Sequence, residues 1–160
     1  QIINMNQKKF KKVIKKFIGL PHRSEIVFKN EFANIINNSK ATNVDATIKS
    51  ISNYKNIYLI LGGRAKEKNF TKILKFKDNI KKIFLIGESE KKISKQLKQI
   101  PNKICTTLDE AVKSIYSEVN INLENYTILF SPACSSFDQY SSFEERGIHF
   151  KELINSQYND

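Results

Sequence analysis

The sequence predicts an α/β fold, a Rossmann-like, mostly parallel sheet with helices on both faces. Short, mainly apolar runs at residues 57–61, 82–86 and 126–130 have the composition of strands that are buried on both sides. Segments with helical periodicity alternate with these runs, and such alternation is typical of parallel sheets joined by right-handed crossovers. With 160 residues and 40% apolar content, the chain is large enough for one domain with its own hydrophobic core.

The first expected element is a helix over residues 7–18. Apolar residues recur there at helical spacing from Phe10 onwards, and lysines occupy the other face. Gly19 is a typical helix stop, and Pro21 prevents the helix from continuing. An isolated basic helix of this kind could touch a membrane, but its length and position favour a packed helix. We expect it to end one structural unit and to lead into the next.

Four elements are expected between residues 25 and 61. Residues 25–29 (EIVFK) and 32–36 (FANII) are strand-like, with a turn between them at Asn30 and Glu31. Residues 42–52 are expected to form a helix. The run at 57–61 (IYLIL) is a buried strand that ends at a pair of glycines.

The remaining elements alternate in the same way. We expect a short helix at 70–76, a strand at 82–86 ended by Gly87, and a helix at 89–99. These are followed by a short strand at 104–105 and a helix at 108–117 with Thr107 as its N-cap. The last strand is 126–130, and residues 136–156 are expected to be mostly helical, with an interruption near Gly147.

The net charge of +11 raises the question of nucleic-acid binding. The lysines are scattered along the whole chain, however, and arginine appears only at Arg23, Arg64 and Arg146. Arginine is the better side chain for bidentate contacts with bases and phosphates. We therefore expect no nucleic-acid partner, although a basic surface attracts anionic small molecules such as nucleotides.

The two cysteines, Cys105 and Cys134, are too few for a disulfide scaffold and form no CxxC pair, so we expect two buried cytosolic thiols. With two histidines in addition, a structural zinc site is not expected. No apolar run is long enough to cross a bilayer, and the first residues do not form a signal peptide, so no membrane contact is expected. Because the first residue is not Met, we expect a fragment or a processed chain.

Three segments follow expected strands at the sheet edge where ligands bind in such folds. They are residues 37–43 (NNSKATN), 62–66 (GGRAK) and 131–138 (SPACSSFD), and the same rule also selects Gly87 and Glu88 after the strand at 82–86. The first also opens a helix, whose N-terminus offers free N–H groups to an anion, although a plain N-cap is an alternative explanation. In the second, glycines let a ligand approach the backbone, and Lys66 is a candidate partner for a carboxylate. The patterns of a P-loop and of a dinucleotide-binding loop are absent.

Two further observations leave alternatives open. In SPACSSFD, Cys134 or Ser136 could be a nucleophile, but His22 and His149, the available bases, lie in no recognisable catalytic pattern. In residues 20–23 (LPHR), Arg23 could bind a phosphate, but on this tetrapeptide alone a domain linker with surface charges is the simpler explanation.

Taken together and in order, LPHR, NNSKATN, LGGRAK and residues 130–147 (FSPACSSFDQYSSFEERG) resemble one family. They look like the carboxy-terminal part of the Mur ligases, and in particular of those that use D-glutamate. The resemblance extends from about Phe17 to Leu153, nearly the whole chain. Sister Mur ligases that add another amino acid have a different signature in place of SKATN and SPACSSFD, and a stand-alone nucleotide- or amino-acid-binding module is a further alternative.

The resemblance implies an ATP-dependent enzyme of peptidoglycan synthesis in the bacterial cytoplasm. Its substrates are UDP-N-acetylmuramoyl-L-alanine, D-glutamate and ATP, and an acyl phosphate is its intermediate. Residues 1–19 would be the terminal helix of a central ATPase domain and a hinge, and residues 20–160 the amino-acid-binding domain. ATP and Mg²⁺ would be held mainly by the central domain, which the chain lacks. The fragment alone is therefore expected to be inactive. Separately, we expect the protein to be a monomer.

The resemblance also assigns site residues. Those expected to bind D-glutamate are Lys66, Thr42, Ser136, Phe137, Phe143 and Lys40. Charge-assisted hydrogen bonds from such groups suit a dicarboxylate. Those expected on the nucleotide side are His22, Arg23 and Asn38, with Arg23 near the γ-phosphate after domain closure. Asn38 stands where the family commonly has an aspartate.

Overall fold

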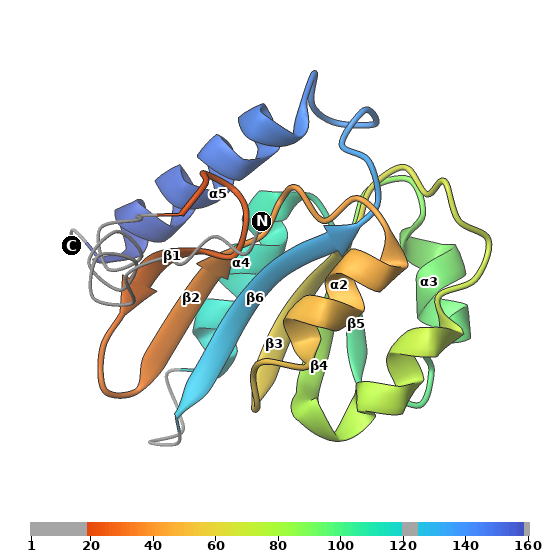
Figure 1. Ribbon diagram of the computed structural model, residues 1–160, viewed down its shortest axis with the longest axis horizontal. Coiled ribbons are helices and arrows are strands. Elements are labelled where there is room, and N and C mark those ends of the chain that lie inside the picture. Colours follow the sequence, from red (N-terminus) through yellow and green to blue (C-terminus); the bar gives the residue numbers. More distant parts are fainter. Residues whose placement is uncertain (1–18, 120–124, 159–160) are drawn as a thin grey trace, which may run out of the picture.

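The computed structural model of the chain describes residues 19–119 and 125–158 (Figure 1). The helix expected over residues 7–18 lies outside the described residues, and so does nearly all of the first expected domain segment. None of the described helices is long and apolar enough to cross a membrane.

Six strands of the described residues form one sheet in the order β1-β2-β6-β3-β4-β5. Their bounds are β1 Glu25–Lys29, β2 Ala33–Asn37, β3 Ile57–Gly62, β4 Ile80–Ile86, β5 Asn102–Thr106 and β6 Tyr126–Ala133. β1 pairs with β2 antiparallel, and every other pair of neighbours is parallel. The expected α/β fold with a mostly parallel sheet is confirmed.

Helices cover both faces of this sheet, as expected (Figure 1). α2 (Val44–Ile51), the 3₁₀ helix η1 (Thr71–Asn79) and α3 (Glu90–Gln96) share one hydrophobic cluster with the sheet. α4 (Leu108–Val119) and α5 (Phe143–Tyr158) share the other. In β3, Leu59 and Leu61 face the first cluster and Ile60 the second. Because both faces of the strand are buried, its sequence is a continuous apolar run.

Two local predictions are confirmed by hydrogen bonds. Thr107 Oγ1 accepts the backbone N–H of Glu110 at 3.3 Å, which is the N-cap contact expected at the start of α4. Asn30 Oδ1 accepts the N–H groups of Phe32 and Ala33 at 2.9 and 2.7 Å, which closes the turn between β1 and β2.

The prediction for residues 136–156 was wrong in two respects. The helix begins at Phe143 rather than at residue 136, because Ser142 Oγ accepts the N–H of Glu145 at 3.1 Å and caps the helix there. It also runs through Gly147 without interruption. The glycine is instead required by close packing, since a Cβ atom at this position would lie 2.2 Å from Nδ1 of His22.

The last strand is longer than predicted. β6 continues past Phe130 through Ser131 and Pro132 to Ala133, so the first three of the eight residues of the SPACSSFD segment belong to the sheet. The loop that follows the strand therefore starts at Cys134.

Candidate functional site

The strand order brings the three expected loop segments to one edge of the sheet. β2, β6 and β3 are neighbours, and SKATN (residues 39–43), the loop from Cys134 onwards and GGRAK follow their carboxyl ends. Backbone hydrogen bonds join the segments directly. Ala133 N donates to Ala41 O at 2.9 Å, while Arg64 and Ser135 exchange two bonds of 3.0 Å. Residues almost a hundred positions apart thus form one surface at the place where such sheets bind ligands.

In SKATN, Lys40 and Phe143 lie together. The Lys40 ammonium is 4.5 Å from the centroid of the Phe143 ring, a cation–π contact between the loop and the start of α5. The side chain of Thr42, two residues further on, is half-buried. The fold therefore brings two residues of the expected D-glutamate pocket, Lys40 and Phe143, into contact.

The start of α2 is less open than the sequence suggested. Asn43 Oδ1 accepts the N–H of Ala46 at 2.8 Å, and the carboxylate of Glu67 accepts the N–H of Val44 at 2.9 Å. The expectation of free N–H groups is thus wrong at these two positions. The protein's own Glu67, the residue after GGRAK, occupies the anion position at this helix end.

In GGRAK, the glycines allow the main chain of neighbouring segments to approach closely. Gly63 has a φ of +124°, and a Cβ atom there would lie 2.4 Å from the carbonyl oxygen of Ser135. The expected role of these glycines is therefore corrected: they allow GGRAK to approach the neighbouring loop. The Arg64 side chain pairs with Glu88 at 2.9 Å, and Lys66 is exposed.

The loop after β6 presents two different side chains. Ser136 is buried, with 2% of its surface exposed, whereas Phe137 is 59% exposed. Ser135 Oγ donates to Arg64 O at 3.0 Å. Phe137 thus lies largely open to solvent in the loop after β6.

Neither cysteine has the surroundings of a nucleophile. Burial raises the pKa of the Cys134 thiol to about 12, and that of Cys105 is also raised by burial. The ring of His22 lies against Asn37 instead, and His149 Nδ1 is 2.8 Å from the hydroxyl of Tyr140. The expectation of two buried thiols is confirmed, and the hydrolase alternative finds no support in these contacts.

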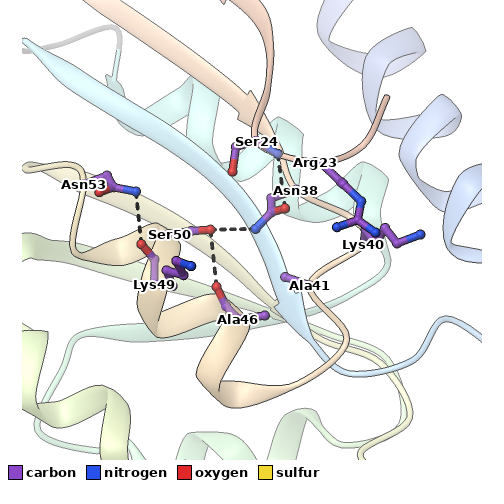
Figure 2. A pocket seen from close by; sticks show the side chains of 9 residues that line it. All are labelled: Arg23, Ser24, Asn38, Lys40, Ala41, Ala46, Lys49, Ser50 and Asn53. Carbon is purple, nitrogen blue, oxygen red and sulfur yellow. Dashed lines mark hydrogen bonds between the residues drawn. The ribbon is translucent and has the colours of Figure 1, made fainter. Parts of the chain in front are cut away.

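Two expected nucleotide-side residues share a cavity of about 280 Å³, shown in Figure 2. Its lining carries three cationic side chains, those of Arg23, Lys40 and Lys49, and no acidic one. The lining residues are Arg23, Ser24, Asn38, Lys40, Ala41, Ala46, Lys49, Ser50 and Asn53. Such a lining favours an anionic ligand.

Asn38 forms the inner wall of this cavity, with its amide fully engaged (Figure 2). Oδ1 accepts the N–H of Ser24 at 3.2 Å, and Nδ2 donates to the hydroxyls of Ser50 at 2.6 Å and Ser131 at 3.2 Å. The side chain is 8% exposed. It therefore ties the segment after LPHR to α2 and β6.

His22 does not line the cavity. Its ring is 5% exposed, its Nδ1 lies 3.0 Å from Nδ2 of Asn37, and its edge faces the Phe143 ring at 6.5 Å. Burial lowers the pKa of this imidazole, although nearby Glu25 opposes the shift. With a φ of +60°, His22 holds a left-handed backbone conformation, and its buried ring fixes LPHR against α5.

Sequence reasoning missed Arg146 as a site residue. Only 1% of this side chain is exposed, and its guanidinium contacts both SKATN and the loop after β6. The pattern Ser142-x-x-Glu145 before it could have located the helix start and hence the inward face of α5.

Comparison with known proteins gives one consistent group of relatives. The chain is 43% identical over 142 residues to a "UDP-N-acetylmuramoylalanine–D-glutamate ligase" of Wolbachia sp. subsp. Brugia malayi, a match that covers 88% of the chain and 28% of the relative. It is 39% identical over 160 residues to the protein of the same name from Prochlorococcus marinus, covering 97% of the chain and 34% of the relative. The chain thus spans about a third of the length of these relatives, and no family model matches it.

A solved structure with a similar fold is that of the UDP-N-acetylmuramate-alanine ligase MurC from Thermotoga maritima. The TM-score is 0.63 at 19% sequence identity, over 91% of this chain and 33% of that one. At this identity the likeness concerns the fold alone.

Proposed function

Because the chain belongs with the carboxy-terminal part of the UDP-N-acetylmuramoylalanine–D-glutamate ligases, members of the Mur ligase family, we propose that it is the D-glutamate-binding domain of such an enzyme. The proposed enzyme joins D-glutamate to UDP-N-acetylmuramoyl-L-alanine with ATP, through an acyl phosphate, in cytoplasmic peptidoglycan synthesis. The observation that carries the proposal is the gathering of SKATN, GGRAK and the loop after β6 at one sheet edge.

The proposed amino-acid pocket takes its groups from these three segments and from α5. Lys66 and Thr42 would bind one carboxylate of D-glutamate, and Ser136 the other, with Lys40 as a nearby cation. Phe143, whose ring already lies 4.5 Å from the Lys40 ammonium, and Phe137 would provide the apolar walls. A dicarboxylate needs cations and hydroxyl or amide donors at both ends, and this set of residues offers both kinds.

On the nucleotide side we propose that Arg23 faces the phosphates of ATP. It lines the cationic cavity of Figure 2, and a guanidinium near the γ-phosphate would stabilise the charge that develops during phosphoryl transfer. His22 would act indirectly in this proposal, by fixing the LPHR segment from which Arg23 projects. Asn38 would support the cavity wall, since its amide is bonded within the protein.

The described residues contain no group of three or more His, Cys, Asp or Glu side chains that fits a metal ion. From the resemblance to the family, we propose that Mg²⁺ and most of the ATP site belong to another part of the enzyme, and that the present chain supplies the amino acid and closes over the nucleotide. The proposed enzyme acts as a monomer.

The test is an NMR titration of the isotope-labelled chain with D-glutamate, L-glutamate and diaminopimelate. Shifts confined to residues 39–43, 64–67 and 134–143, and larger for D-glutamate than for the other two, are expected. Equal responses to all three amino acids, or shifts elsewhere on the surface, would contradict the proposed pocket.

A further inference from the structure

Arg146 is a buried cation without an acidic partner among the described residues. Only 1% of the side chain is exposed, and no carboxylate of those residues forms an ion pair with it. Burial lowers the pKa of the guanidinium to about 10, which leaves it charged at neutral pH. Asp138 acts on this charge only through space, and burying a charge that has no ion-pair partner is unfavourable, so a packing role alone does not explain why arginine stands here.

The guanidinium joins two of the loop segments. Nη2 donates to the carbonyl oxygens of Ser39 at 2.9 Å and Cys134 at 3.1 Å. Nε donates to Ser39 Oγ at 3.1 Å, and that hydroxyl donates to the carbonyl of Phe143 at 2.8 Å. One planar group thus connects the start of SKATN, the loop after β6 and the first turn of α5. No other side-chain type offers several donors in this fixed fork.

The third segment lies against the remaining nitrogen. Nη1 is buried and has no hydrogen-bond partner, and a Cβ atom on Gly63 would lie 3.2 Å from it. The guanidinium therefore sits where SKATN, GGRAK and the loop after β6 meet. A side chain at position 63 would lie only 2.4 Å from the carbonyl oxygen of Ser135, so a glycine is required where the loops approach each other beside the guanidinium.

We propose that Arg146 is a positioning residue of the acidic-amino-acid pocket. Its guanidinium sets the distance between Lys40 and Thr42 on one loop and Ser136 on the other, and its positive charge favours a dicarboxylate without contacting it. This inference rests on the proposed function. It adds a residue whose contacts are all within the protein, and it links the specificity for an acidic substrate to a charge beneath the loops.

The test compares three variants of the full chain. Arg146→Met removes the donors and the charge, Arg146→Lys keeps the charge but not the fork, and Lys95→Met on the exposed side of α3 is a control with the same change in net charge. The first readout is the dissociation constant for D-glutamate and for D-glutamine, which lacks the second carboxylate. The second is amide hydrogen exchange at Ala41 and Ser135, whose N–H groups are hydrogen-bonded in the loops.

For Arg146→Met we expect D-glutamate binding to weaken at least about tenfold, equivalent to about 1.4 kcal/mol, and D-glutamine binding to weaken less. Arg146→Lys should retain the preference for D-glutamate over D-glutamine while binding both more weakly. Exchange should accelerate at the loop amides of both Arg146 variants and not in the strand interiors, and Lys95→Met should match the wild type.

Three results would overturn the inference. Arg146→Met could bind D-glutamate as the wild type does. Both amino acids could lose affinity equally in Arg146→Met with unchanged loop exchange, or exchange could accelerate throughout the sheet, which would indicate a purely structural role. A wild-type chain that binds no D-glutamate would instead refute the proposed function, and with it the effect of the Arg146 charge on substrate preference. The hydrogen-exchange data would then still decide whether Arg146 positions the loops.

Discussion

Replacing Gly147 by alanine should break the contact that holds LPHR against α5. A methyl group at this position would lie 2.2 Å from Nδ1 and 2.8 Å from Cγ of His22. These are atoms of a rigid ring that is 5% exposed, so it cannot swing aside without leaving its pocket. Moving the ring also breaks its 3.0 Å contact with Asn37.

The magnitude follows from opposing effects. Alanine in the middle of a helix is more favourable than glycine by about 1 kcal/mol. Overpacking a full site costs about 1–3 kcal/mol, and leaving the buried His22 and Asn37 groups without their partner costs about 1–3 kcal/mol more. Gly147→Ala should therefore destabilise the chain by about 1–5 kcal/mol, although it improves the helix propensity.

Urea unfolding of a double-mutant cycle checks this reasoning. In a His22→Ala background the ring is gone, and Gly147→Ala should then stabilise the chain by about 1 kcal/mol. Ser156→Ala, an exposed change on the same helix, should shift stability by less than about 0.5 kcal/mol and serves as the control. If Gly147→Ala has the same effect with and without His22, the packing explanation is refuted.

Three further outcomes are expected. Burial lowers the pKa of His22 below 6.5, so the folded state disfavours the protonated ring. The urea midpoint should therefore fall as pH decreases from about 7.5 to 5.5, and it should fall less in His22→Gln. A fall of equal size in that variant would exclude His22 as its source. Burial raises the pKa of the Cys134 thiol to about 12 and also raises that of Cys105. Ellman's reagent at pH 8 should therefore modify neither thiol in the native chain and both in urea. Rapid modification of the native chain would contradict the burial of these groups. In a ligase that contains this chain, Lys66→Ala should raise the KM for D-glutamate at least about tenfold, since one charge-assisted bond is lost, and the KM for ATP much less. An equal rise in KM for both substrates would count against the assignment of Lys66.

The local elements were predictable because their causes are local. A strand buried on both faces needs a continuous apolar run, and residues 57–61, 82–86 and 126–130 supply it. The hydroxyl of Thr107 and the amide of Asn30 form bonds within three residues, so their roles follow from the sequence near them.

The remaining features depend on contacts between distant residues. The place of β6 between β2 and β3 is set by crossover connections, and the sequence carries no local mark of it. Gly147 resembles a helix interruption until the ring of His22, 125 positions earlier in the chain, is seen beside it. The carboxylate of Glu67 accepts the N–H of Val44 at the start of α2, and Arg146 donates to Ser39, which precedes it by 107 residues. Neither role can be inferred from neighbouring residues.

The segments of the candidate site were found because each follows a strand, and the fold brings those strands together. Individual roles within them are less predictable. Asn38 lines a cavity, but its side-chain amide is hydrogen-bonded to Ser24, Ser50 and Ser131. His22 stands next to Arg23 in the sequence but does not line the cavity that Arg23 lines, because its ring packs against Asn37 and Phe143 instead.

The most direct measurement of the central claim is phosphate release by a chimera in which this chain replaces the carboxy-terminal part of a homologous D-glutamate ligase. With UDP-N-acetylmuramoyl-L-alanine, ATP and magnesium, we expect release that depends on D-glutamate and is not supported by L-glutamate or diaminopimelate. Release with another amino acid, or none with any of them from a folded chimera that binds ATP, would contradict the assignment of this chain as a D-glutamate-binding domain.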